Sequence, residues 1–175
     1  MAIRRIIELG QDDVLRAHAE PVAHFDAALH ALLDDMAETM IAGNGAGLAA
    51  PQVGVSARCC VIDVTDAATD RDEEHEADEG PCILELVNPE IASSEGEMTV
   101  IEGCLSVPGR AGRVVRPERV TVRAFDRNGK PFEIAGEGML AVCLCHEIDH
   151  LDGIVYVDRM IEDCTEVLRQ KGVLS

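Results

Sequence analysis

The stretch "LAVCLCHEIDHLDG", residues 140–153, contains two histidines four positions apart and a glutamate directly after the first of them. Residues four apart on a helix lie on one face with Cβ atoms about 5–6 Å apart, so His146 and His150 can bind one metal ion. Glu147 lies one position further round the helix, where it can act as a general base without being a ligand. The pattern predicts a metal-binding helix that ends at Asp152-Gly153.

The residues before this motif are apolar, which predicts that the helix is buried. Charged residues on a buried helix need partners, so a chance occurrence of the motif on a solvated helix is disfavoured. Counting back three, four and seven positions from His146 gives Cys143, Val142 and Met139, which form an apolar wall beside the metal, ordinary core packing, or both. Asp149 is interpreted either as a carboxylate that orients a ligand histidine or caps a neighbouring segment, or as an exposed residue in a salt bridge.

A catalytic metal site of this kind needs a third protein ligand and an open position for water. No histidine follows His150, and Glu162 and Glu166 are candidates that lack the usual helical setting. Further upstream, "EGCLS" at 102–106 offers Cys104, whose thiolate is a strong ligand when it lies beside a divalent cation. The alternative for Cys104 is a buried free cysteine, which is the expected state of most of the other cysteines.

Length and composition limit the classes of protein to which the chain can belong. It has 175 residues, which favours a single catalytic domain over 1–175. Hydrophobic residues make up 47% of the chain and aromatic residues only 2%, so the core must be aliphatic. The formal net charge of −18 argues against direct binding to nucleic acid or to anionic lipid.

Much of the negative charge lies in one segment, "DVTDAATDRDEEHEADE" at 63–79. We interpret 65–80 as an acidic loop insertion whose side chains are solvated. A protein-binding or cation-binding segment and an adaptation to high salt are the alternatives, and the sequence does not separate them.

Cellular location is predicted from the first residues and from the cysteines. "MAIRRIIELG" lacks the long apolar run of a signal peptide, and no window of the chain approaches a membrane span. The seven cysteines lie mostly inside apolar segments, and Cys59, Cys60, Cys82 and Cys143 are predicted to be small buried hydrophobic residues. We therefore expect a cytoplasmic protein in a reducing environment, without a disulfide framework and without a membrane segment.

Apolar residues at helical spacing predict a long N-terminal amphipathic helix over 22–42. The other predicted elements are strands at 58–64 and 82–91, a strand followed by irregular backbone at 95–109, a hairpin over 119–138 around Asn128-Gly129, and a short last helix within 161–175. This order predicts an α+β domain in which mostly antiparallel strands pack around the central metal-binding helix.

The segment "GNGAGLAAPQVG" at 43–54 has three glycines in its first five residues, which let the backbone approach another group closely or adopt positive φ. It lacks the Lys and Ser/Thr of a phosphate loop. Taken together and in this order, "GAGLAAPQVG", "EGCLSVPG" and "HEIDHLDG" resemble the three motifs of the peptide deformylase family, and the resemblance covers nearly the whole chain. Enzymes of that family remove the formyl group from N-formylmethionine at the start of new bacterial polypeptides.

The resemblance implies a role for individual residues. Cys104, His146 and His150 would bind one divalent metal ion, usually Fe²⁺ in that family, with Zn²⁺, Ni²⁺ or Co²⁺ also able to occupy the site. Glu147 would be the general base. Gln52 and the backbone N–H of Leu105 would polarise the formyl oxygen.

The implied substrate contacts involve backbone and side chains around the metal. Gly45, Ala46 and Gly47 would pair with the peptide backbone as an added strand does, and Gly103 would leave room for it. The implied walls of the methionine pocket are Ala46, Val100, Met139, Val142 and Cys143, with Glu102 beside them and paired to Arg116. The implied partners are N-formylmethionyl nascent chains at the ribosome exit, and a monomer is expected.

The chain departs from the family pattern at Cys145, where that family usually has Gln. A second thiol near the metal either changes oxidation sensitivity and metal preference or is a buried spectator. The stretch "PGRAGRVVRP" leaves open whether Arg110 or Arg113 faces the substrate.

Two other functions remain possible from the residues alone. One is a metallopeptidase that cleaves internal bonds, against which the cysteine ligand and the motif around Gln52 argue. The other is a structural metal site without catalysis, which would require a fourth protein ligand such as Cys145.

Overall fold

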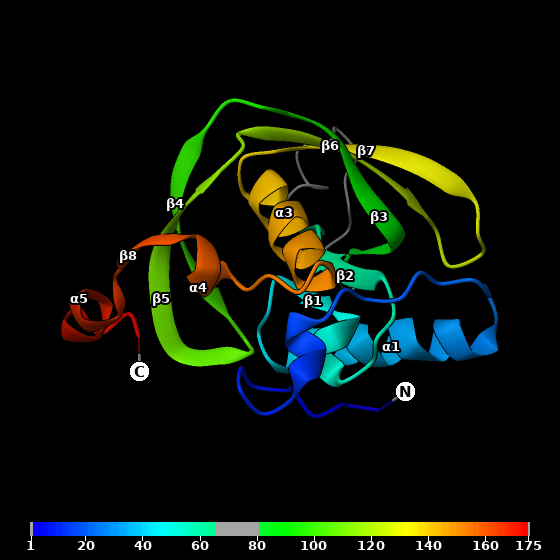
Figure 1. The fold of residues 1–175 in the computed structure, drawn as a ribbon, viewed down its shortest axis with the longest axis horizontal. Coiled ribbons are helices and arrows are strands. Elements are labelled where there is room, and N and C mark those ends of the chain that lie inside the picture. The colour runs from blue at the N-terminus through cyan, green and yellow to red at the C-terminus, as the bar shows by residue number, and fades with distance from the viewer. Residues whose placement is uncertain (1, 66–80, 175) are drawn as a thin grey trace.

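The computed structural model of the protein describes residues 2–65 and 81–174, so the predicted acidic insertion at 65–80 lies almost wholly outside the described residues. Helices and antiparallel sheets are combined in one mixed architecture (Figure 1). The helices are η1 Asp13–Arg16, α1 Ala27–Ala42, η2 Ala50–Val53, α3 Met139–Leu151, α4 Tyr156–Arg159 and α5 Thr165–Gln170. The strands are β1 Gly47–Ala49, β2 Cys59–Asp63, β3 Ile83–Glu95, β4 Met98–Cys104, β5 Val107–Arg116, β6 Arg119–Phe125, β7 Pro131–Glu137 and β8 Met160–Asp163.

The strands form two sheets, and all pairings are antiparallel. The larger sheet has the order β1-β2-β3-β6-β7 and the smaller one the order β4-β5-β8. The predicted hairpin around Asn128-Gly129 is confirmed, because β6 pairs with β7 and Gly129 has the positive φ of 80° that a tight turn requires. Figure 1 shows α3 lying between the strands of the two sheets.

Helix α1 begins at Ala27, so the prediction that this helix starts at residue 22 is wrong. The Asp26 carboxylate accepts hydrogen bonds from the backbone N–H groups of Ala28 and Leu29 and so caps the helix there. Upstream of the cap, the backbone N–H of Val22 donates to the side-chain oxygen of Asn88 at 2.8 Å, and the side-chain N–H of Asn88 donates to the carbonyl oxygen of Val22 at 2.9 Å. These contacts hold Val22 to β3, outside the helix.

One further prediction about the backbone is wrong. Irregular backbone was expected up to residue 109, but the chain turns tightly after Cys104 and enters β5 at Val107, which pairs with Cys104. The short last helix that was expected within 161–175 is confirmed as α5 Thr165–Gln170, and Met160–Asp163 before it forms β8. β5 is stabilised by pairing with β4, across the tight turn, and with β8, which is distant in sequence.

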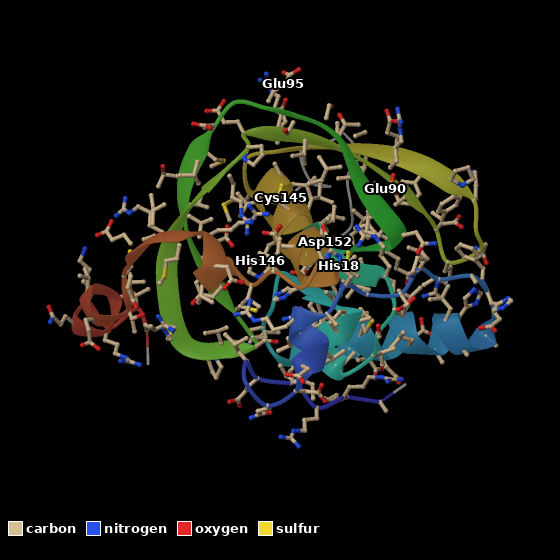
Figure 2. All side chains as sticks on the ribbon, viewed as in Figure 1. His18, Glu90, Glu95, Cys145, His146 and Asp152 are labelled. Carbon is tan, nitrogen blue, oxygen red and sulfur yellow. The ribbon has the colours of Figure 1, made fainter. Side chains whose placement is uncertain are left out.

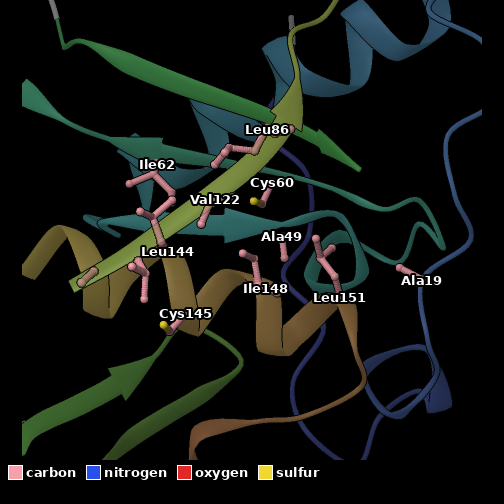
Figure 3. Packing of buried hydrophobic residues seen from close by; sticks show 13 residues of the cluster. Ala19, Ala49, Cys60, Ile62, Leu86, Val122, Leu144, Cys145, Ile148 and Leu151 are labelled. Atoms are coloured by element: carbon pink, nitrogen blue, oxygen red, sulfur yellow. The ribbon is translucent and has the colours of Figure 1, made fainter. Parts of the chain in front are cut away.

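The core around α3 explains why this helix is fixed in position. Its apolar face packs against the larger sheet, and Figure 3 shows Leu144, Ile148 and Leu151 among side chains from β2, β3 and β6. Each leucine or isoleucine buried in this way contributes roughly 1.5–3 kcal/mol. The opposite side of the helix is thereby held towards β4 and β5.

All seven cysteines are free thiols and all lie in the described part of the chain. Cys59 and Cys60 are buried as predicted, and Cys143 is half-buried. The prediction for Cys82 is wrong, because it precedes β3 and is exposed, with its backbone N–H donating to Thr65. Within 2–65 and 81–174, no helix combines the length and the apolar character needed to cross a membrane.

Candidate metal centre and substrate cavity

Three potential metal ligands converge where the end of β4 meets α3. The ligand atoms of Cys104, His146 and His150 all lie within 4.8 Å of one another. Cys104 Sγ is 3.2 Å from His150 Nε2, and the backbone N–H of Ser106 donates to the same sulfur at 3.4 Å. The turn between β4 and β5 therefore aims the thiol at the helix.

The other two candidates for a third ligand, Glu162 and Glu166, do not belong to this group. Both are exposed, and they form ion pairs with Arg113 and Arg169 respectively. The structure brings together the cysteine and the two histidines, which are more than forty positions apart in sequence.

The ring of His146 is held on three sides. Its Nδ1 lies 2.7 Å from a carboxylate oxygen of Glu102, which leaves Nε2 as the nitrogen available to a metal. The ring stacks on Tyr156 with centroids 6.2 Å apart and meets His150 edge-on at 4.9 Å. In Figure 2 His146 lies in the interior, whereas Glu95 lies at the outer end of β3.

Behind His146 lies a buried network of charged groups. Arg116 donates to both carboxylate oxygens of Glu102, at 2.6 and 3.0 Å, which confirms the predicted pair. Arg116 also donates to Asp149 at 2.6 Å, and Arg159 approaches the same carboxylate at 2.6 and 2.7 Å. Asp149 is therefore neither exposed nor bonded to a ligand histidine. It holds Arg116, which in turn holds Glu102.

This network lowers the pKa of Glu102. Burial alone would raise that pKa, but the hydrogen bonds from Arg116 and His146 outweigh burial and lower it to about 2. Glu102 is therefore a carboxylate at neutral pH and accepts a hydrogen bond from the Nδ1–H of His146, a bond that sets the tautomer of the ring.

The charges around the three ligands suit a divalent cation. Burial lowers the pKa of His146, but its hydrogen bonds to Cys104 and Glu102 outweigh burial and raise it to about 10, so these neighbours favour positive charge at this place. Burial lowers the pKa of His150 well below its usual value, which keeps this imidazole neutral as a ligand must be.

Glu147 lies next to the ligands with its side chain buried. The residue is 4% exposed, and its Oε2 has no hydrogen-bond partner among the described residues. Burial raises the pKa of Glu147 to about 7. A buried carboxylate oxygen without a protein partner is suited to a water molecule or a cation, so the residues fit the metal that the chemistry requires.

Gln52 is fixed beside the thiol by η2. Its Oε1 accepts a hydrogen bond from the backbone N–H of Ala49 at 2.9 Å, and this bond orients the amide. Its Nε2 then donates towards Cys104 Sγ at 3.4 Å and towards Ser106 Oγ at 3.2 Å. Leu105 follows Cys104 directly, so the side-chain amide and this part of the backbone flank the same sulfur.

A cavity of about 600 Å³ opens over these groups. The predicted site residues that line it are Gly45, Ala46, Gly47, Gln52, Glu102, Gly103, Cys104, Leu105, Met139, Val142, Cys143, His146 and Glu147. Val100 is not among the lining residues, and the next residue of β4, Ile101, takes that place. His150 lies below the surface of the cavity and is 1% exposed.

Several residues that line the cavity were not predicted, among them Pro108, Gly109 and Leu174. Pro108 and Gly109 end the motif "EGCLSVPG", which could have indicated them, whereas no local pattern marks Leu174, because the segment after α5 reaches the cavity only through tertiary contacts. Of the two arginines that the sequence left open, Arg110 lines the cavity and Arg113 does not, and both are ion-paired, with Asp163 and Glu162 respectively.

The glycines of the 43–54 segment are required by close contacts. A Cβ on Gly47 would lie 2.4 Å from Glu147 Oε1, and one on Gly45 would lie 2.9 Å from Leu105 Cδ1. Neither glycine has the positive φ that a turn would demand. Glycine at these two positions therefore allows the backbone of this segment to lie directly against the side chains of Glu147 and Leu105.

Cys145 is not one of the three converging ligands, and it belongs to the buried cluster shown in Figure 3. It is 4% exposed, and burial raises its pKa to about 11. Such a thiol agrees with the interpretation of Cys145 as a buried spectator, and the ligand group found among the described residues does not include it as a fourth member.

A Cys-His-His group beside a buried carboxylate, on the wall of an open cavity, defines the class of metal-dependent hydrolases. Comparison with known proteins narrows this class. The family model for polypeptide deformylase matches residues 3–166. The chain belongs to the peptide deformylase family, whose metal-dependent enzymes remove the formyl group from the N-formylmethionine of nascent peptides.

Individual relatives are similar in sequence to this protein over almost its whole length. A peptide deformylase of Acetivibrio thermocellus is 52% identical over 161 residues, which cover 92% of this chain and 85% of the relative. One from Caldicellulosiruptor bescii is 48% identical over 166 residues, covering 95% and 90%. The crystal structure of a peptide deformylase from Legionella pneumophila matches with a TM-score of 0.79 and 49% identity, covering 98% of this chain and 94% of that one.

Proposed function

We propose that this chain, as a single catalytic domain, hydrolyses the formyl amide of N-formylmethionyl nascent peptides with one divalent metal ion held by Cys104, His146 and His150 on the α3 helix and β4. The observation that carries this proposal is the convergence of those three ligand atoms within 4.8 Å, beside the buried carboxylate of Glu147. Soft thiolate with two imidazoles suits both Fe²⁺ and Zn²⁺, and the family resemblance favours Fe²⁺, with Ni²⁺ and Co²⁺ as further candidates.

Glu147, Gln52 and Leu105 each have a separate role in the proposed reaction. Glu147 accepts a proton from the attacking water and returns it to the leaving amine, so that water adds to the formyl carbon, the C–N bond breaks, and formate and a free amine result. Gln52 Nε2 and the backbone N–H of Leu105 donate to the formyl oxygen as negative charge develops on it. When bound, the divalent ion supplies a Lewis acid that lowers the pKa of water and polarises the carbonyl.

The cavity also supplies binding contacts for the peptide. Gly45 to Gly47 pair with its backbone, and the apolar wall of Met139, Val142 and Cys143, with Ala46, receives the methionine side chain. Glu102 lines the cavity, but both its oxygens are engaged by Arg116 and His146, so its proposed role is to position His146. We further propose that the enzyme is a cytoplasmic monomer that meets its substrate at the ribosome exit and binds no nucleic acid.

The proposal is tested by an anaerobic assay with formyl-Met-Ala, with metal analysis on the same sample. We expect stoichiometric release of formate, loss of activity on chelation, and its return when a divalent metal is added. Cleavage of an unblocked peptide at an internal bond would favour a metallopeptidase instead. Bound metal without any turnover would favour a structural site.

Glu102→Gln is expected to weaken metal binding by about 10–100-fold, because partners of ligand histidines typically contribute that much. Glutamine keeps the shape of the Glu102 side chain but lacks the negative charge of the carboxylate that accepts the hydrogen bond from His146. Metal affinity is measured by competition with a chelator, and circular dichroism verifies the fold. Glu162→Gln, in an exposed ion pair with Arg113, serves as the control that should retain full affinity. Equal affinities in the two variants would contradict the positioning role.

A further inference from the structure

The segment that follows α5 returns to the cavity. Leu174 lines the same cavity as Gln52 and Glu147 and is half-buried there. Its neighbour Val173 does not line the cavity and is 71% exposed. The side chain of Leu174 therefore faces the cavity, whereas the side chain of the adjacent Val173 is exposed to solvent.

Hydrogen bonds fix this segment against β5. The backbone N–H of Cys164 donates to Ala111 O at 2.9 Å, and the Arg169 guanidinium donates to Gly109 O at 2.9 Å. After α5, Gly172 adopts a φ of 69° and the Val173 N–H donates back to Leu168 O at 3.0 Å, which reverses the chain. Figure 1 shows α5 and the C-terminal end beside β5.

The other walls of the cavity have roles in the proposed reaction. The α3 side receives the methionine side chain, and Gly45 to Gly47 pair with the peptide backbone. The rest of the lining includes the start of β5, where Pro108 and Gly109 lie, and Leu174, together with Gly43, Asn44, Ile101 and Val107. Arg110 is also in this part, but its guanidinium is ion-paired with Asp163 at 3.0 Å, so its charge is compensated.

We propose that Leu174 is a specificity-determining residue that, with Pro108 and Gly109, contacts the side chain of the third residue of the formylated peptide and favours an apolar one there. This inference rests on the proposed function. A peptide whose first side chain occupies the α3 wall and whose backbone pairs with Gly45–Gly47 can extend its third residue over the lining that these contacts leave free. Pro108, Gly109 and Leu174 in that lining are apolar, so they favour burial of an apolar side chain.

The test compares formyl-Met-Ala-Leu with formyl-Met-Ala-Asp as substrates of the metal-loaded enzyme. We expect Leu174→Ser to reduce the preference for the leucine peptide, measured as the ratio of the two kcat/KM values, by about tenfold, the lower end for apolar contacts in a binding pocket. The change should appear in KM with kcat unchanged, because the contact is made equally in the ground state and the transition state. Activity on formyl-Met-Ala, which lacks the third residue, should be unaltered and also shows that the variant is folded.

Val173→Ser is the matched control, because it makes the same kind of change one residue away on an exposed side chain; its ratio should equal that of the unsubstituted enzyme. An unchanged ratio in an active Leu174→Ser enzyme would overturn this inference alone. Failure of the unsubstituted enzyme to release formate from any of the three peptides would overturn the proposed function, and this inference with it.

Discussion

Glu147→Gln is expected to lower turnover of formyl-Met-Ala by about 10²–10⁴-fold while the metal content per chain stays the same, because general acid–base catalysis contributes that range. The amide has the shape of the carboxylate but cannot accept a proton from water. The carboxylate is also suited to this task by its surroundings, since burial raises the pKa of Glu147 to about 7, near the pH at which the reaction must run.

The measurement combines formate release with metal analysis of the same preparation. Glu133→Gln is a suitable control, because Glu133 is an exposed residue of β7 whose carboxylate pairs with Arg123 on the sheet surface. That variant should keep both activity and metal. Near-normal turnover by Glu147→Gln would rule out the general-base role, and loss of the metal would instead make Glu147 a ligand.

The helix motif was readable from the sequence because its geometry is local. Spacing along one helix places His146 and His150 on the same face, and α3 needs no other part of the chain for that relation. The third ligand is a different case. Cys104 is linked to the histidines only by the β4–β5 turn and the packing of α3, so the residues alone left Glu162 and Glu166 as alternatives, and only the resemblance to a family selected the cysteine.

Other features escaped prediction because their causes are not local. The stretch "PGRAGRVVR" carries glycine and proline, which weaken any strand signal, yet it forms β5 because β4 and β8 pair with it on either side. The resemblance implied the pair of Glu102 and Arg116, but no spacing in the sequence indicates the contact from Arg116 to Asp149, which extends this pair from β4 and β5 to α3. Leu174 reaches the cavity by the same kind of tertiary contact.

Gly47→Ala is the second variant with a large expected effect, a loss of about 10²-fold in kcat/KM. The new Cβ would lie 2.4 Å from Glu147 Oε1 and 2.8 Å from its Cδ, distances that no pair of such atoms tolerates. The strand cannot retreat easily, because Gly47 is paired with Ile62 in the larger sheet. The flexible end of Glu147 must therefore move, and a displacement of about 1 Å at a catalytic group is enough for a loss of this size.

A double-mutant cycle separates this mechanism from the other proposed role of Gly47, which is pairing with the peptide backbone. If the methyl group acts by displacing the Glu147 carboxylate, then adding Gly47→Ala to Glu147→Gln should cost little further activity, since no catalytic carboxylate remains to be displaced. If the methyl group acts by obstructing the peptide, the same loss should appear in both backgrounds and should be seen mainly in KM. The residual activity of the Glu147→Gln enzyme is followed by formate accumulation over hours, with metal content and circular dichroism recorded for all four proteins. Equal losses in the two backgrounds would show that the strict need for glycine at this position comes from the substrate and not from the general base.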